Sequence, residues 1–240
     1  MDKFGFSTFT LKIIAVVTMV IDHFAYALVN ESTMTYTVLR SIGRISFPIF
    51  CFVLVEGYFH THNRLEHCIR LGIFALISEV PFDAFQGDLW NLKHQNVLFT
   101  LFIGFVMIWG LDMISAFRLN YPEKLTKKIG AGRLNTLCEL VVIMLGLGSA
   151  YILKSSYSYA GIMLILCFYA FHKQNIGKIV SIIVFNMGMY PIGIQWWGTA
   201  GILPIALYNE KPGKRSGKYF FYCFYPLHLM ILVLVRNCMG

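Results

Sequence analysis

Long apolar runs separated by short polar segments recur along the whole chain, and they predict membrane-spanning helices. A helix needs about twenty mostly apolar residues to cross roughly 30 Å of hydrocarbon. Nine runs meet or approach this length: 11–29, 45–59, 69–85, 97–117, 134–153, 157–171, 178–193, 196–208 and 219–236. Because several runs are short and one contains Pro204, we expect eight to ten spans. The pattern predicts an all-α, polytopic transmembrane helix bundle that forms a single domain, residues 1–240.

Composition and charge agree with this pattern and give the bundle an orientation. Of the 240 residues, 57% are hydrophobic and 13% are charged, whereas about a quarter of a soluble domain is charged. If the loops after even-numbered spans lie on the N-terminal side, that side holds fifteen of the 20 Lys and Arg residues. Cytoplasmic loops are enriched in Lys and Arg, so we expect a cytoplasmic N-terminus. We interpret the basic loops 118–133 and 209–219 as orientation signals in contact with lipid headgroups, with phosphate binding as the alternative. The net charge of +8 therefore needs no nucleic-acid partner.

The first predicted span carries two adjacent polar residues, Asp22 and His23. An Asp at the centre of a membrane helix costs about 2.5 to 3.5 kcal/mol on the insertion scale, so a functional role is the default interpretation. A purely structural polar pair is the alternative. The first run is also too long for a cleavable signal, so we expect a permanent span.

Lys12 precedes His23 by eleven residues, which places both on one helix face about 16 Å apart. A cation at the cytoplasmic surface and an imidazole deep in the membrane suit a long donor with an anionic head. Coenzyme A has this form, and a histidine is the usual general base near neutral pH. The alternative for Lys12 is simple extension of its side chain to the membrane interface.

The other polar residues within the predicted spans divide by depth into two candidate subsites. The inner subsite is expected to hold an anionic cytoplasmic donor and comprises Lys12, Glu56, His60, Arg64 and Arg70. The deeper subsite is expected to hold the reacting centre and an acceptor and comprises Asp22, His23, Arg44, Glu79 and His228. Interhelical hydrogen bonds or ion pairs are the alternative for each residue.

Other chemistries lack their sequence signatures. The six cysteines form no CxxC pair or Cys/His cluster, so we expect packing roles for them and no metal site. The motifs GxxxxGK(S/T), GxSxG and HExxH are absent, which argues against an ATP-driven pump, a membrane hydrolase and a metalloprotease.

Five segments resemble the TraX family, which is named for the F-pilin acetylation protein. They are LKIIAVVTMVIDHF, RSIGRISFPIFCFVLVEGYFHT, RLGIFALISEVPFD, NVLFT and KYFFYCFYPLHL. The spacing of Lys12 and His23 is also similar to the Arg/Lys-x10-His pattern of acyltransferase-3 membrane acyltransferases. The resemblance implies acetyl transfer from acetyl-CoA, to the N-terminal amine of a pilin subunit in the case of TraX itself. It implies His23 as the base, with supporting roles for Asp22, Arg44, Glu56, Glu79 and His228.

One position departs from the family pattern. An Asp-Tyr-Gly-like stretch is expected around Tyr157, and Ser156 stands here where that Asp is expected. If the Asp holds the acceptor amine, this chain uses another acceptor.

These observations predict an acetyltransferase of the bacterial inner membrane. It would move acetyl from cytoplasmic acetyl-CoA to an amine or hydroxyl of a protein N-terminus, a glycan or a small molecule, at the membrane or its outer face. His23 would remove the acceptor proton and Arg44 would stabilise the oxyanion. Lys12, Arg64 and Arg70 would bind the coenzyme A phosphates. The first alternative is a transporter that relays protons through Asp22, His23, Glu79 and His228. The second is a non-catalytic membrane assembly factor.

Overall fold

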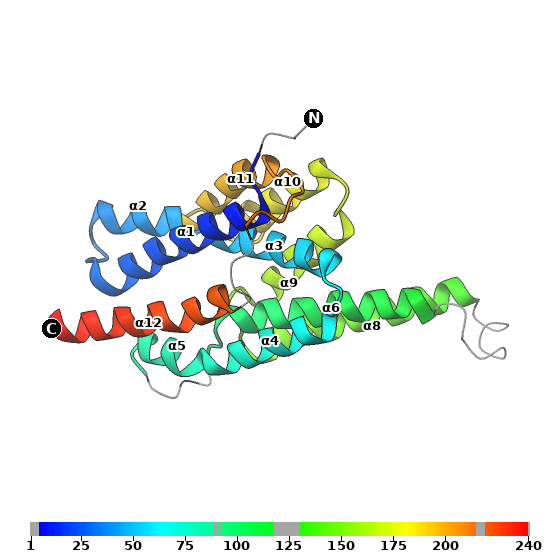
Figure 1. Ribbon diagram of the computed structural model, residues 1–240, viewed down its shortest axis with the longest axis horizontal. Helices are drawn as coiled ribbons and strands as arrows, with labels where there is room; N and C mark the ends of the chain where they lie inside the picture. The colour runs from blue at the N-terminus through cyan, green and yellow to red at the C-terminus, as the bar shows by residue number, and fades with distance from the viewer. Residues whose placement is uncertain (1–4, 89–90, 92, 118–129, 215–218, 240) are drawn as a thin grey trace.

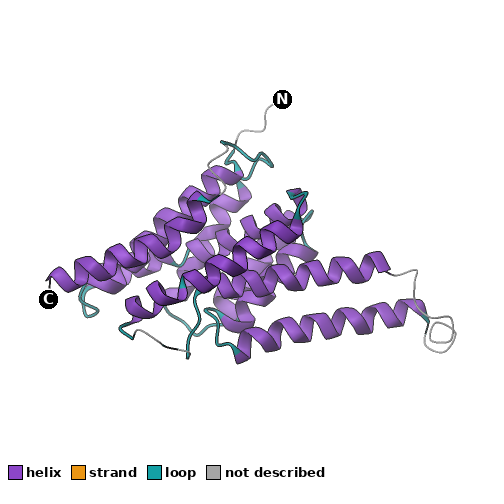
Figure 2. Ribbon diagram, turned by 60° about the horizontal axis from the view of Figure 1, so that its bottom comes forward, coloured by secondary structure: helices purple, strands orange, loops and turns teal. Residues whose placement is uncertain are grey.

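The computed structural model describes residues 5–88, 91, 93–117, 130–214 and 219–239. This part of the chain is helical, with two isolated β-bridges and no strand (Figures 1 and 2). The helices are α1 (Thr8–Leu28), α2 (Met34–Gly43), α3 (Ser46–His60), α4 (Arg64–Ile77), α5 (Glu79–Gln86), α6 (Val97–Phe117), α8 (Ala131–Ile152), α9 (Ser158–Ala170), α10 (Asn175–Ile183), a π-helix (Val184–Gly188), a 3-10 helix (Ile194–Gly201), α11 (Ile202–Ala206) and α12 (Phe220–Met239). Residues 118–129 and 215–218, which carry part of both basic loops, lie outside the described residues.

Among the described residues, five stretches are long and apolar enough to cross a membrane: Thr8–Leu28, Met34–His60, Val97–Ala116, Ala131–Ile152 and Phe220–Met239. The all-helical, membrane-protein prediction is therefore confirmed. The predicted number of nine spans and the cytoplasmic N-terminus stay predictions.

Several shorter predicted runs are broken or irregular helices, and proline explains one break. The run 69–85 divides at Ser78 into α4 and α5. Pro81 has no N–H to donate to the carbonyl of Ile77, where α4 ends, and proline is tolerated in the first turn of α5. In the run 178–193, α10 ends at Ile183, the π-helix follows, and the residues after Gly188 are not helical.

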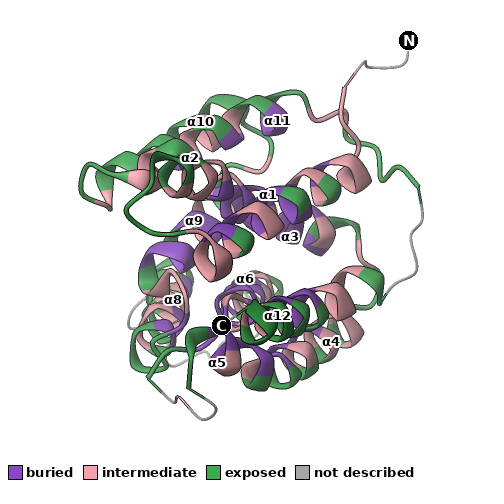
Figure 3. Cartoon of the chain, turned by 90° about the vertical axis from the view of Figure 1, so that its left-hand side faces the viewer, coloured by how far each residue is buried: buried purple, intermediate pink, exposed green. Residues whose placement is uncertain are grey.

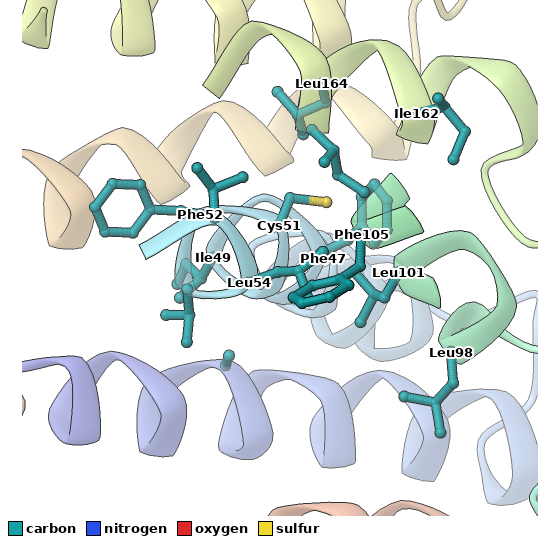
Figure 4. Close-up of a cluster of buried hydrophobic side chains, with 14 of the residues drawn as sticks. Phe47, Ile49, Cys51, Phe52, Leu54, Leu98, Leu101, Phe105, Ile162 and Leu164 are labelled. Carbon is teal, nitrogen blue, oxygen red and sulfur yellow. The ribbon is translucent and has the colours of Figure 1, made fainter. Parts of the chain in front are cut away.

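The buried core is built around α3, and the stretch of α2 and α3 is the most buried of the five candidate spans. Phe47 and Phe52 of α3, Phe105 of α6 and apolar residues of α9 belong to one buried cluster (Figure 4), in which Phe52 packs edge-on against Phe168 of α9. Gly161 permits this close packing, because an added Cβ would lie 2.7 Å from Cγ2 of Thr100. The helix α9 thereby joins α3 to α6 and α8.

Two neighbourhoods of this bundle position the candidate site. The helices α1 and α2 lie side by side, and α12 runs along both α1 and α5 (Figure 1). Apolar side chains cover the outside of the bundle, for example Leu140, Met144 and Leu145 of α8, which are 52%, 66% and 64% exposed (Figure 3 colours the chain by burial). A surface of this kind suits contact with hydrocarbon rather than water.

Candidate active site

A cavity of about 620 Å³ lies where α1, α2, α5, α12 and the segment 151–160 meet. Its charged and titratable lining residues in the described part of the chain are Asp22, His23, Arg40, Arg44, His94 and Lys154. Its aromatic lining residues are Tyr26, Phe47, Phe50, Phe82, Phe85, Tyr151, Tyr157, Tyr159, Tyr190 and Tyr225. With three cations and one carboxylate, the lining of this cavity has a net positive charge when the histidines are neutral. We refer to it as the α1–α2 cavity.

Asp22 binds two arginines on one wall of this cavity. Its carboxylate lies 2.5 Å from Nη1 of Arg40 and 2.8 Å from Nη2 of Arg44. The two arginines are four residues apart at the end of α2, so they project to the same side. Asp22 is 8% exposed, and burial of its carboxylate is offset by these two charge-assisted hydrogen bonds.

Gly43 makes the approach of α2 to α1 possible, because an added Cβ would lie 2.2 Å from Cβ of Asp22. We therefore expect Gly43→Ala to separate the two helices and weaken both ion pairs, lowering the free energy of unfolding by about 1 to 3 kcal/mol. Unfolding in mixed detergent micelles would measure this change. Gly148→Ala in α8 is the matched control, since its added Cβ meets no atom within 4 Å. Equal stability of the two variants would contradict the tight α1–α2 contact.

His23 faces a different neighbour from Asp22, because successive residues of a helix point about 100° apart. Its Nδ1 lies 2.7 Å from Nε2 of His228 in α12, and the two rings are stacked. Nδ1 of His228 lies 3.0 Å from the carbonyl oxygen of Phe224.

This geometry assigns the protons of both imidazoles. The Phe224 carbonyl can only accept, so Nδ1 of His228 carries a proton and Nε2 of the neutral ring accepts from Nδ1 of His23. Nε2 of His23 then keeps its lone pair, and it forms no hydrogen bond with the described part of the chain. His23 lines the α1–α2 cavity, whereas His228 is buried behind it at 6% exposure.

Tyr157 completes the cavity wall beside Arg44. Its hydroxyl lies 3.5 Å from Nη1 of Arg44, and its ring stacks on Phe47 with centroids 3.7 Å apart. The segment before it is fixed to the start of α6, because the backbone N–H of Ser156 donates to Gln95 and the Thr100 hydroxyl bonds to Ser155.

Glu79 lies outside the lining of the α1–α2 cavity. Its carboxylate accepts from the backbone N–H of Asn96 at 2.9 Å and from the Asn96 side-chain amide, which also donates to Ala75. This residue therefore ties α5 to the start of α6.

The five residues expected to bind the donor lie in separate places. Glu56 and His60 line a second cavity of about 720 Å³, where Glu56 lies 3.1 Å from Nε2 of His172. His172 lies between α9 and α10, and burial lowers the pKa of its imidazole although the Glu56 carboxylate opposes the shift. Arg64 instead binds Asp112 of α6 at 2.7 Å.

Arg70 and Lys12 lie nearer to the beginning of α12. Arg70 pairs with Glu66, and Nζ of Lys12 lies 5.5 Å from the ring centroid of Phe221. The positive charges of Lys12 and Arg70 both act on His67, which places these two of the five residues in one electrostatic neighbourhood.

The sequence interpretation missed Arg40, Tyr157 and Asp112. Arg40 repeats the position of Arg44 one helical turn earlier, and that spacing is a usable signal. Asp112 is a carboxylate inside an apolar run, where it accepts from the hydroxyl of Tyr58 at 2.9 Å. Tyr157 is one of 13 tyrosines in the chain, and its one signal was its place in the stretch where the family resemblance implies an Asp-Tyr-Gly-like sequence.

The residues of this site lie within the part of the chain that is similar to known proteins. The profile of the family described as TraX protein matches residues 7–236. A curated relative from Dichelobacter nodosus, "Probable fimbrial assembly protein FimC, serogroup H1", is 30% identical over 243 residues, which cover 95% of this chain and 94% of that protein. No solved structure gives a significant match. The matched range includes the lining of the α1–α2 cavity and also His228, the partner of His23.

Proposed function

The chain belongs to the TraX family, and from this premise we propose that it is a membrane-bound acyltransferase. It transfers acetyl from acetyl-CoA on the cytoplasmic side to an amine or hydroxyl of an acceptor at the membrane or its outer face. We further propose a multi-pass arrangement of about nine spans in a bacterial inner membrane, with the N-terminus in the cytoplasm. The printed name of the Dichelobacter nodosus relative makes a fimbrial protein one candidate acceptor.

The observation that carries this proposal is the hydrogen bond between His23 and His228 at the wall of a cavity. Because Nδ1 of His23 donates this hydrogen bond, Nε2 of His23 keeps a lone pair that no described residue uses. A general base needs such a lone pair. His228 orients this base, in the way that a buried partner orients the histidine of a catalytic triad. His23 would remove the proton from the acceptor as the acceptor attacks the thioester carbonyl.

The charge of the α1–α2 cavity supports the same chemistry. Attack on a thioester places negative charge on the carbonyl oxygen, and fixed cations in a site of low dielectric constant stabilise such charge. Arg44 donates to Asp22 and Tyr157, and its guanidinium has further N–H groups for an oxyanion. Asp22 holds both arginines in place.

The donor would reach His23 between α1 and α12. Lys12 contacts the beginning of α12 through Phe221, and His23 contacts the same helix through His228. The helices α1 and α12 are therefore in contact both at the cation Lys12 and at the proposed base His23. Lys12 and Arg70 would bind the phosphates of coenzyme A, with Arg64, Glu56 and His60 at the same predicted membrane face.

Ligand binding tests the proposal directly. We expect acetyl-CoA and coenzyme A to raise the thermal unfolding midpoint of the purified protein, because a ligand that binds the native state stabilises it. Lys12→Ala should remove most of this rise. Arg133→Ala, which removes an exposed cation on the same predicted side, should retain it.

Two results would count against this assignment. A wild-type protein that does not respond to either ligand would contradict the acyltransferase proposal. If that protein also carried a pH-dependent flux in proteoliposomes, the transporter hypothesis would take its place.

A further inference from the structure

We infer that Tyr157 is a catalytic residue whose hydroxyl donates a hydrogen bond to the carbonyl oxygen of the reacting thioester. The inference rests on the proposed acyl transfer and adds to it a second residue of the cavity that His23 lines. It is derived from the contacts of Tyr157, from the conformation of the segment that carries it and from its place in the α1–α2 cavity.

The hydrogen-bond chemistry of the Tyr157–Arg44 contact leaves one donor unused. A guanidinium has donors only, so in this contact Arg44 donates and the oxygen of Tyr157 accepts. The phenolic O–H of Tyr157 has no acceptor among the described residues. Since Tyr157 lines the cavity, this O–H is free to bind an acceptor atom of a ligand there.

The position of the hydroxyl is also fixed in advance. The ring of Tyr157 is clamped against Phe47 with an angle of 10° between the planes, and it lies 6.0 Å from the ring of Phe185. A rigid donor of this kind needs no reorganisation when charge develops on a neighbouring oxygen.

The backbone around Tyr157 is unusual in a way that points to function. Lys154, Tyr157 and Ser158 have φ of 50°, 63° and 43°, a region that residues other than glycine rarely occupy. Strained backbone of this type persists where the surrounding structure enforces it and is concentrated at functional sites. Here the hydrogen bonds of Gln95 and Thr100 to residues 154–156 enforce it, and the result is presentation of Tyr157 to the cavity.

The proposed transfer has an addition stage and an elimination stage. The acceptor N–H or O–H gives its proton to Nε2 of His23 while its electron pair forms a bond to the acetyl carbonyl carbon. The π electrons of the carbonyl move to its oxygen, where the O–H of Tyr157 and an N–H of Arg44 stabilise the charge. When the carbonyl re-forms, the carbon–sulfur bond breaks and the coenzyme A sulfur takes the proton from His23.

Hydrolysis of acetyl-CoA by the purified protein in lipid nanodiscs tests the assignment, with water replacing the unidentified acceptor and free thiol as the readout. Loss of one oxyanion donor lowers kcat by about 10²- to 10³-fold, and we expect a reduction of this order for Tyr157→Phe. The KM for acetyl-CoA and the thermal shift that it induces should stay unchanged, because the ring and its stacking are kept. Tyr169→Phe is the matched control, since its hydroxyl contacts Asp112 outside the α1–α2 cavity. Incorporation of 3-fluorotyrosine at position 157 retains the hydroxyl and should retain the rate.

Each other outcome has a definite meaning. A Tyr157→Phe variant as fast as the wild type would overturn the assignment and leave the proposed acyl transfer intact. A variant that also lost the thermal shift would show a role in folding or donor binding, which overturns the assignment as well. A wild-type protein that releases thiol no faster than nanodiscs without protein would refute the acyl transfer itself, and the role of Tyr157 with it.

Discussion

Replacement of His23 by Gln is expected to lower acetyl-CoA hydrolysis by about 10²- to 10⁴-fold, the usual contribution of a positioned general base. Glutamine retains a polar side chain that can still bond to Nε2 of His228, so the fold and the cavity should persist. What it lacks is the free lone pair of Nε2, which in the native chain is set by the hydrogen bonds running from His23 to His228 and on to Phe224. The measurement is the rate of thiol release under saturating acetyl-CoA.

The control for this experiment is His62→Gln, which changes an exposed histidine after α3 and should leave the rate unchanged. A His23→Gln rate within a few-fold of the wild type would show that another group removes the proton. Retained acetyl-CoA binding together with a lost rate would separate the role of His23 in chemistry from any role in binding.

The residues of this pair illustrate what the sequence could and could not predict. His23 and His228 were both candidates from the sequence because they are ionisable residues within apolar runs. Burying such a residue in hydrocarbon is costly, so its presence there suggests a function. Their direct contact spans 205 residues and depends on how α12 is rotated against α1. Periodicity gives the faces of one helix, but it gives no rotation relative to a neighbour.

The same reason explains the donor-binding residues. The sequence predicted that Glu56, Arg64 and Arg70 lie at one membrane face. Depth in the membrane alone could not show which residue pairs with each of them. In the structure Glu56 pairs with His172, Arg64 with Asp112 and Arg70 with Glu66. His172 and Asp112 follow or lie in apolar runs that depth sorting did not connect with α3 or α4.

Helix breaks mark a further limit of prediction from hydropathy. The run 69–85 is apolar enough to be taken as one span, yet it is two helices that meet at Ser78. Hydropathy takes no account of the backbone N–H that Pro81 lacks. The preference of proline for the first turn of a helix would have predicted a break before it. The predicted ranges of the long apolar helices α1, α6, α8 and α12 agree with the structure within a few residues, although Pro226 lies inside α12.

Neutralising Asp22 is expected to destabilise the protein more than any other single change at the site. In Asp22→Asn the guanidinium groups of Arg40 and Arg44 lose their carboxylate, and arginine cannot shed its charge. Removing one partner of a buried ion pair costs about 3 to 5 kcal/mol, so we expect a loss of this size in the free energy of unfolding in mixed micelles. Asp88→Asn, at an exposed position after α5, should change the stability little.

A second substitution tests whether charge balance is the cause. Asp22, Arg40 and Arg44 together carry one net positive charge, Asp22→Asn raises this to two, and adding Arg40→Gln returns it to one. If the uncompensated guanidinium causes the loss, the double variant should be more stable than Asp22→Asn alone, a coupling that non-interacting sites do not show. A double variant that loses the sum of both single effects would mean that Arg40 stabilises the chain independently of Asp22. In that case Arg44 alone would compensate the buried negative charge of Asp22. Arg44 is also the arginine that contacts Tyr157.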